Sequence, residues 1–294
     1  MSVSRTWIGV ALVLFAAVIL ASTSVSAVVS YGGGANPSAV IFIRFAGAIV
    51  VLYCLLRYSG APIRLPPRRR AFALTLGFAQ AAQSYFLYTA LDHISVGLTT
   101  IIFYIYPLLV GLFASAIGQD RLTWTLGGGL VIAFVGLMFV FNITGEGLNF
   151  IGASFAVFAA ISWSLVVVVN IWLARGGDSR PVTLHVQASA LFIVSVILII
   201  VGDVQFPQTL RAWTGYLLMP ILYGVGITAF FFAASMIGSV RSSLIMNFEP
   251  VSAIILGYLI LGQTLTPLQL FGGATVLSTL FVVKWDAERR MKRA

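Results

Sequence analysis

Glu249 is the residue whose type and position most directly indicate chemistry. It lies within a long apolar run and directly precedes Pro250. A carboxylate is costly inside lipid, so such residues usually face a protein interior or a water-filled path and mark functional sites. Three roles fit Glu249: a proton carrier, a partner for a substrate ammonium group, or a structural hydrogen-bonding group. Arg44, a cation in another apolar run, fits a substrate carboxylate, a counter-ion for Glu249, or a side chain that extends to the membrane surface.

Uncharged polar and aromatic side chains interrupt the other apolar runs. The polar ones either bind a small molecule or join helices, and an interhelical hydrogen bond contributes about 0.6 kcal/mol on average. Hydrogen bonds from Gln80, Gln83 and Asn247 are expected to hold the polar end of a substrate. Trp163 and Tyr104 are expected to stack on its apolar end. The predicted substrate-binding residues are Gln80, Gln83, Thr99, Tyr104, Trp163, Tyr223, Ser242 and Asn247.

Few residues suit a catalytic or metal centre. The two histidines, His93 and His185, lie far apart in the sequence, and the single cysteine, Cys54, sits in an apolar run. No Ser-His-Asp or metal-ligand cluster is apparent. No G-x-x-x-x-G-K-[ST] loop occurs, which argues against ATP hydrolysis by this chain. The sequence therefore predicts no enzymatic activity, no metal and no cofactor.

An internal repeat positions these residues. A shift of 143 positions (250 minus 107) brings Pro107 onto Pro250 and Leu122-Thr123 onto Leu265-Thr266. Proline removes a backbone hydrogen-bond donor and breaks a helix interior. The predicted coupling or hinge residues are Glu249, Pro107, Pro250 and Arg44.

The composition indicates a membrane protein. The 294 residues are 60% hydrophobic and 9% charged, whereas soluble domains carry about 25% charged residues. Continuous apolar runs of roughly 20 residues fit membrane-spanning helices and do not fit the alternating pattern of a transmembrane barrel. Ten spans are predicted, at 7–29, 38–56, 71–90, 95–117, 124–142, 150–173, 182–201, 213–234, 240–261 and 268–285.

The charge distribution predicts the orientation. If the N-terminus is cytoplasmic, 15 of the 17 basic residues, all but Arg44 and Arg211, lie on or near the cytoplasmic side. This is the asymmetry of the positive-inside rule. It accounts for the net charge of +9 without a nucleic-acid partner. We expect a multi-pass membrane protein with both termini in the cytoplasm.

Span count and repeat together predict the architecture. Ten spans in two copies give five helices per half, over residues 1–146 and 147–294. An odd number of crossings inverts the second copy, an arrangement that recurs in secondary transporters. The predicted fold class is an all-α polytopic membrane protein with ten transmembrane helices as two inverted five-helix repeats.

The repeated block also carries a family resemblance. Tyr106-Pro107 through Gly118-Gln119-Asp120-Arg121-Leu122-Thr123, and Glu249-Pro250 through Leu261-Gly262-Gln263-Thr264-Leu265-Thr266, resemble the EamA-type ten-helix exporters of the drug/metabolite transporter superfamily. Gln263 stands where that family usually has an acidic residue, which Asp120 retains in the first half. Within the superfamily the chain is similar to the aromatic amino-acid exporter branch. The resemblance implies inner-membrane export of amino acids, aromatic ones among them, from a cavity between the halves.

Three functions are weighed. The leading one is a secondary transporter that exports small metabolites, foremost amino acids, by alternating access. The alternative is a proton-coupled multidrug efflux transporter, for which Glu249 would be indispensable. A membrane-embedded enzyme is a distant third. The expected partners are a small-molecule substrate and the lipid bilayer, with no nucleic acid, and the expected oligomeric state is a monomer or a homodimer.

Overall fold

The computed structural model describes residues 3–141, 149–174 and 177–293. Within this part of the chain the backbone forms twelve helices and no strand. They are α1 (Val3–Tyr31), α2 (Pro37–Tyr58), α3 (Pro67–Leu91), α4 (Val96–Phe103), α5 (Tyr106–Ala116), α6 (Trp124–Phe141), α7 (Phe150–Ala174), α8 (Arg180–Val201), α9 (Leu210–Ile237), α10 (Ser239–Met246), α11 (Phe248–Leu261) and α12 (Pro267–Arg293).

Two of the ten predicted spans are broken helices. The span predicted at 95–117 consists of α4 and α5, and the one at 240–261 consists of α10 and α11. Pro107 and Pro250 lie in the first turn of α5 and of α11, where proline is tolerated because the first turn lacks hydrogen-bond acceptors for its N–H groups. The predicted proline breaks are therefore confirmed in both halves, while the role of the prolines as hinges stays a prediction.

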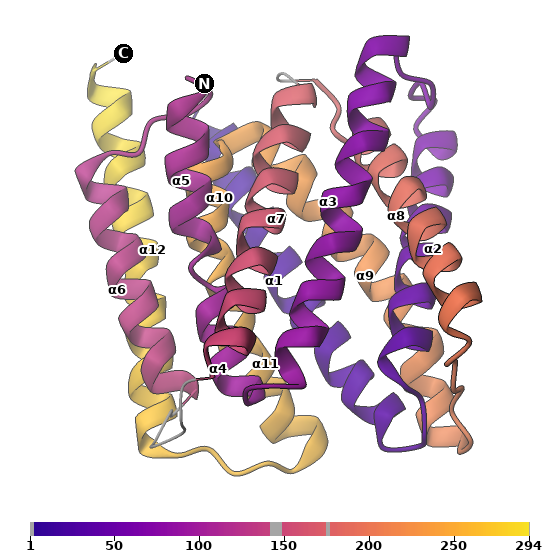
Figure 1. Cartoon of the computed structure of the whole chain (residues 1–294). Coiled ribbons are helices and arrows are strands. Elements are labelled where there is room, and N and C mark those ends of the chain that lie inside the picture. Colours follow the sequence, from indigo (N-terminus) through magenta and orange to yellow (C-terminus); the bar gives the residue numbers. More distant parts are fainter. Residues whose placement is uncertain (1–2, 142–148, 175–176, 294) are drawn as a thin grey trace.

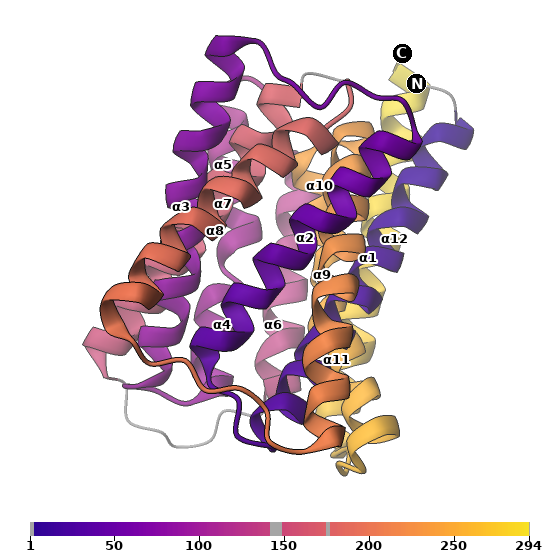
Figure 2. The ribbon, with the colours of Figure 1, turned by 90° about the vertical axis from the view of Figure 1, so that its right-hand side faces the viewer.

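The helix α3 differs from the other spans in composition. Nine helical stretches in the described part of the chain are long and apolar enough to cross a membrane, and α3 is not among them. Its middle carries Gln80 and Gln83, and its start carries three consecutive arginines. It nevertheless stands alongside α7 and α8 (Figures 1 and 2) and packs against both. It is the tenth span, made polar by the residues it contributes to the protein interior.

The two halves have opposite orientations. Figure 1 shows α1 beginning and α12 ending on one side of the molecule, whereas α6 ends and α7 begins on the other side. The first half, α1–α6, thus crosses in one overall direction and the second half, α7–α12, crosses back. The predicted inverted arrangement is confirmed. The predicted boundary at residues 146 and 147 lies outside the described residues.

Contacts between the halves form the seam of the molecule. Helix α1 packs along α9 and α11, α3 along α7 and α8, and α6 along α12. Small residues permit the closest of these approaches: a Cβ atom placed on Gly136 of α6 would lie 3.0 Å from the carbonyl oxygen of Gly272 in α12. Close backbone approach through glycine is a common packing mode of membrane helices. The seam therefore brings the polar residues of both halves toward one central region.

Candidate substrate-binding cavity

A cavity of about 460 Å³ lies at the seam, with walls from both halves. Its volume falls within the usual range of small-molecule sites, roughly 300–1,000 Å³. The lining residues are Leu20, Thr23, Ser24, Arg44, Gln80, Gln83, Leu87, Val96, Thr100, Phe103, Tyr104, Tyr106, Phe141, Trp163, Tyr223, Ile227, Met246, Glu249, Pro250, Ala253, Ile254 and Gln263.

The cavity extends toward the side opposite the start of α1. Among its lining residues, Thr23 lies in the second half of α1, Val96 begins α4, Phe141 ends α6, and Gln263 follows α11. These helix ends all lie on the side where α6 ends and α7 begins (Figure 1). No lining residue comes from the described ends of α5, α8 or α12 at the other side. The cavity thus faces away from the two chain termini.

Arg44 of α2 is held at the cavity by neutral groups. Its Nη2 donates a hydrogen bond to Ser84 Oγ at 3.0 Å. Its guanidinium carbon lies 5.2 Å from the ring centre of Phe45 and 4.9 Å from that of Tyr223, which is cation–π geometry. In the described part of the chain Arg44 forms no ion pair, and its buried Nε has no hydrogen-bond partner. The cation is oriented without being neutralised, so it can receive an anionic group.

Glu249 contributes the opposite charge to the same cavity. It lies in the first turn of α11, where the helix dipole stabilises a negative charge, and the Tyr104 hydroxyl lies beside its carboxyl group. Among the described residues Glu249 has no cation in ion-pair contact, although it lies within electrostatic range of Arg44. The cavity therefore presents a positive and a negative group, one from each half, that do not contact each other.

Helix α3 supplies a wall of hydrogen-bonding groups next to Arg44. Gln80 Nε2 donates to Gln83 Oε1 at 3.3 Å, and Ser84 Oγ lies 3.5 Å from Gln83 Oε1. Gln80 Oε1 is buried and has no partner among the described residues. A buried polar atom without a partner is uncommon in proteins. This wall is thus suited to a polar ligand group or an ordered water.

Aromatic rings form the remaining wall and pack on one another. Tyr106 lies 5.4 Å from Phe103 and 5.7 Å from Tyr104 between ring centres. Trp163 of α7 stands edge-on to Tyr106 at 6.4 Å and stacks on Phe230 at 6.3 Å. Aromatic pairs at these separations are favourable beyond their buried area. The rings therefore hold each other in fixed positions around the apolar part of the cavity.

Eight of the twelve predicted site residues line this cavity: Arg44, Gln80, Gln83, Tyr104, Trp163, Tyr223, Glu249 and Pro250. The structure places the other four elsewhere: Thr99, Pro107, Ser242 and Asn247. Thr99 is buried within α4, and Pro107 is buried near the start of α5. A contact of these four with substrate would require a rearrangement of the broken helices.

Ser242 and Asn247 hydrogen-bond to their own helix. Ser242 Oγ donates to the carbonyl oxygens of Gly238 and Ser239, at 2.8 and 3.0 Å. Asn247 Nδ2 donates to the carbonyl oxygen of Leu244 at 3.0 Å, at the break between α10 and α11. Short polar side chains commonly satisfy themselves in this way. In this conformation the polar groups of both side chains are therefore used for hydrogen bonds within the broken helix.

Fourteen of the 22 lining residues were missing from the predicted site, and four of them show why. Thr23 and Ser24 belong to α1, Phe141 ends α6, and Tyr106 precedes the first proline. The polar pair in α1 was visible as an interruption of an apolar run, the same signal that selected the glutamines. Phe141 carries no such signal, because one phenylalanine among many does not reveal which face of a helix it occupies.

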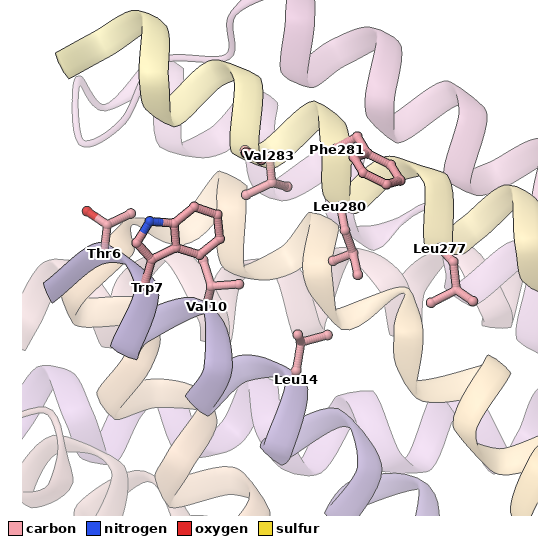
Figure 3. A pocket seen from close by; sticks show the side chains of 9 residues that line it. Thr6, Trp7, Val10, Leu14, Leu277, Leu280, Phe281 and Val283 are labelled. Atoms are coloured by element: carbon pink, nitrogen blue, oxygen red, sulfur yellow. The ribbon is translucent and has the colours of Figure 1, made fainter. Parts of the chain in front are cut away.

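A second hollow, of about 440 Å³, lies between α1 and α12 (Figure 3). Apart from Thr6 and Lys284 its lining is apolar, with Trp7, Leu14 and Phe281 among the residues drawn. It shares no lining residue with the central cavity. Of these two hollows in the described part of the chain, the central cavity is the one that combines charges of both signs with hydrogen-bonding groups, so it is the candidate binding site.

No metal centre accompanies the cavity in the part of the chain that the structure describes. No group of three or more histidine, cysteine, aspartate or glutamate side chains there is placed to hold a metal ion. The side chains that line the cavity are suited to ion pairing, hydrogen bonding and aromatic packing.

Comparison with known proteins yields one family and several relatives. The model of the EamA-like transporter family matches residues 7–142 and again residues 150–285. The threonine/homoserine exporter RhtA of Escherichia coli strain K12 is 25% identical over 229 residues, which cover 74% of this chain and 72% of the exporter. Its counterpart in Salmonella typhimurium strain SL1344 is 24% identical over 226 residues, with the same coverage of both chains.

Two further likenesses concern a plant protein and a solved structure. A WAT1-related chloroplastic protein of Arabidopsis thaliana is 27% identical over 256 residues, covering 82% of this chain and 60% of the plant protein. A chain of known crystal structure matches with a TM-score of 0.79 at 17% identity, covering 97% of this chain and 99% of that one. The structural match supports the fold alone.

Proposed function

Since the chain belongs to the EamA-like transporter family, we propose that it exports amino acids by alternating access, with the central cavity as the binding site. Family membership and the RhtA relatives make the chain a multi-pass membrane transporter of small molecules rather than an enzyme. The predicted family is thus confirmed. The substrate class and the direction of transport are the proposal.

One observation carries the proposal: Arg44 and Glu249 line one cavity without contacting each other. A free amino acid is a zwitterion whose two charged groups match this arrangement. Its carboxylate would bind the Arg44 guanidinium, which suits carboxylates through paired N–H donors. Its ammonium group would bind the Glu249 carboxylate. Charge-assisted hydrogen bonds of this kind are about twice as strong as neutral ones.

The aromatic wall supports a large apolar side chain on the substrate. Tyr104, Tyr106 and Trp163 line the cavity together, and aromatic surfaces favour offset or edge-on contact with another ring. We therefore propose aromatic amino acids as the preferred substrates. The RhtA relatives are named for threonine and homoserine, so small hydroxylated amino acids are the competing substrates in any test.

The proposed location is the bacterial inner membrane, with both termini in the cytoplasm. Support comes from the predicted spans, which put 15 of the 17 basic residues on or near the side of the termini. In this orientation the cavity of the present structure faces the periplasm. Fusion of a reporter that is active on only one side of the membrane to the C-terminus tests this, and a signal from the periplasm would contradict it.

The test of the substrate is flux in proteoliposomes. Labelled phenylalanine, tryptophan, threonine and homoserine are compared for the wild type and for Arg44→Gln and Glu249→Gln. Aromatic amino acids should be transported, and both variants should lose most of that flux. Arg211→Gln is the matched control, because Arg211 is an exposed arginine at the start of α9 outside the cavity. Full flux in both cavity variants would contradict the proposal.

Proton-coupled efflux of drugs is the second candidate, and the position of Glu249 favours it. A carboxyl group that lines the cavity without an ion-pair partner among the described residues is able to exchange a proton for a cargo. In that case transport of a neutral drug should respond to a pH gradient and stop in Glu249→Gln. Amino-acid flux that is independent of the gradient would exclude this candidate.

A further inference from the structure

The turns that follow α5 and α11 are repeat partners that make different contacts. Asp120 lies in the first turn and Gln263 in the second, and the repeat shift relates them (263 minus 120 is 143). The proposed binding site uses Gln263 only as a lining residue and does not use Asp120 at all. Their surroundings differ on the two sides of the molecule.

On the side of the termini, Asp120 caps a helix of the other half. Its Oδ2 accepts a hydrogen bond from the backbone N–H of Val240, in the first turn of α10, at 3.3 Å. The residue before α10 is Gly238, which has a φ of +93° and no side chain to serve as a cap. A Cβ atom on Gly238 would lie 2.5 Å from Asp120 Oδ2. Only glycine fits this backbone and this contact, so the start of α10 relies on Asp120.

The same turn also reaches α12. Thr123 Oγ1 donates to Asp286 Oδ1 at 2.9 Å, and Arg241 Nη2 of α10 pairs with Asp286 Oδ2 at 2.7 Å. Arg241 and Asp286 are 8% and 3% exposed, so this ion pair is removed from solvent. Asp120, Thr123, Val240, Arg241 and Asp286 together join the two halves, and we call them the terminus-side gate.

On the opposite side the described residues form no equivalent contact. Gln263 lines the cavity, and its Oε1 lies beside Gly257 of the preceding helix α11. The repeat partner of Val240 is Gly97 in the first turn of α4 (240 minus 97 is 143). In the described part of the chain Gln263 makes no hydrogen bond to the first half, and α4 is capped by its own Ser95, which accepts from Leu98 N at 3.2 Å. The cavity is open where this contact is missing.

We propose that Asp120 and Gln263 are paired positioning residues of the transport cycle. In the present conformation Asp120 holds the start of α10 and the cavity faces away from the termini. In the alternate conformation Gln263 Oε1 accepts a hydrogen bond from Gly97 N, Asp120 leaves Val240, and the cavity opens toward the termini. A carboxylate accepts a stronger hydrogen bond from the start of a helix than a neutral amide does. The first repeat has the carboxylate of Asp120 where the second repeat has the amide of Gln263. The conformation described here, which uses the Asp120 contact, is therefore favoured.

The experiment measures which side of the cavity is open, without any substrate. Cys54 is first replaced by serine. Single reporter cysteines are then placed at Ser239, which is fully buried at the start of α10, and at Thr100, which lines the cavity. A membrane-impermeant thiol reagent is applied from each side of proteoliposomes of known orientation. In Asp120→Asn we expect labelling of the Ser239→Cys reporter to rise about tenfold, the ratio that corresponds to replacing a charged hydrogen-bond acceptor by a neutral one, and labelling of Thr100→Cys to fall.

A second variant acts from the other side of the membrane. Gln263→Glu places a charge where the repeat partner has one, and Gln263 is exposed, so the fold should tolerate it. It should shift both reporters in the same directions as Asp120→Asn. The control is Asp178→Asn, which breaks an ion pair with Arg180 on the side of the termini but outside the gate, and which should leave both reporters unchanged.

The outcomes separate the alternatives. Opposite shifts of the two reporters support the proposal. Unchanged labelling in both variants overturns it, and so do increases at both reporters together, since these indicate a loosened fold rather than a reoriented one. If Asp120→Asn does not yield folded protein, Gln263→Glu decides alone. The proposal rests on alternating access but not on the substrate, so its failure would leave the amino-acid assignment untouched, and a failed flux assay would leave the labelling result standing.

Discussion

Arg44→Gln is the most direct test of the charges in the cavity. The substitution keeps an amide that is able to hydrogen-bond Ser84 but removes the cation that faces the cavity. A hydrogen bond to a charged group contributes about 1.5–3 kcal/mol. Arg44 is only partly buried, so solvent screening places the loss near the lower end. A loss of about 1.5 kcal/mol corresponds to about a tenfold weaker Kd.

The assay compares three ligands that differ in one charged group each. Phenylalanine carries both groups, phenethylamine lacks the carboxylate, and 3-phenylpropanoate lacks the ammonium group. Equilibrium binding to purified protein should weaken about tenfold for phenylalanine and 3-phenylpropanoate in Arg44→Gln, and stay unchanged for phenethylamine. Glu249→Gln should show the reverse pattern: weaker phenylalanine and phenethylamine, unchanged 3-phenylpropanoate.

Pairing each variant with each ligand forms a thermodynamic cycle, which isolates the interaction of one side chain with one ligand group. The same loss for all three ligands in Arg44→Gln would refute the reasoning. It would mean that Arg44 supports the shape of the cavity through Phe45 and Tyr223 instead of binding a carboxylate.

Three further predictions concern single side chains. Trp163→Ala should reduce flux of aromatic amino acids several-fold because the ring lines the cavity, and it should also lower the thermal unfolding midpoint in detergent because the ring packs on Tyr106 and Phe230. Gly238→Ala should destabilise the protein by about 1–2 kcal/mol, because its φ is +93°; Gly127→Ala, with nothing within 4 Å of its added Cβ, should be neutral in the same unfolding assay. Arg241→Gln should cost about 3 kcal/mol of stability because it removes the cation that pairs with the buried Asp286, whereas Arg180→Gln, at a partly exposed pair, should change stability by less than about 1 kcal/mol.

Much of the fold follows from the sequence because a membrane leaves few alternatives. Backbone groups in lipid must be paired within the segment, so an apolar run of about 20 residues has to be a helix. The predicted spans at 124–142 and 150–173 accordingly match α6 and α7 to within a residue at each end. Inversion then followed from an odd number of helices per repeat. Even α3, whose glutamines lower its hydropathy, was recovered, because without a span at 71–90 the basic residues would no longer gather on one side of the membrane.

The site was harder to predict because a polar side chain in a helix has two options: it hydrogen-bonds to its own helix, or it extends into the cavity. Ser242 and Gln80 look alike in the sequence, each a polar residue in an apolar run. Serine reaches back to a carbonyl of its own helix, whereas the Gln80 side chain is too long for that bond and extends into the cavity. The contact of Arg241 with Asp286 was also hidden, because the two residues lie on different helices and the repeat partner of Arg241 is Leu98.

The placement of the two cavity charges links substrate binding to the relative movement of the two halves. Arg44 belongs to α2 in the first half and Glu249 to α11 in the second. A zwitterion bound by both bridges the halves, and its binding energy depends on the separation between them. A ligand shifts a conformational equilibrium only by its difference in affinity for the two states. Ligands that carry only one of the two charges form a charge-assisted contact with one half only, so the charges do not make their binding depend on the separation of the halves. They should therefore bind to the cavity and inhibit transport, yet leave the labelling ratio of the Ser239→Cys and Thr100→Cys reporters unchanged, whereas a transported amino acid should change it.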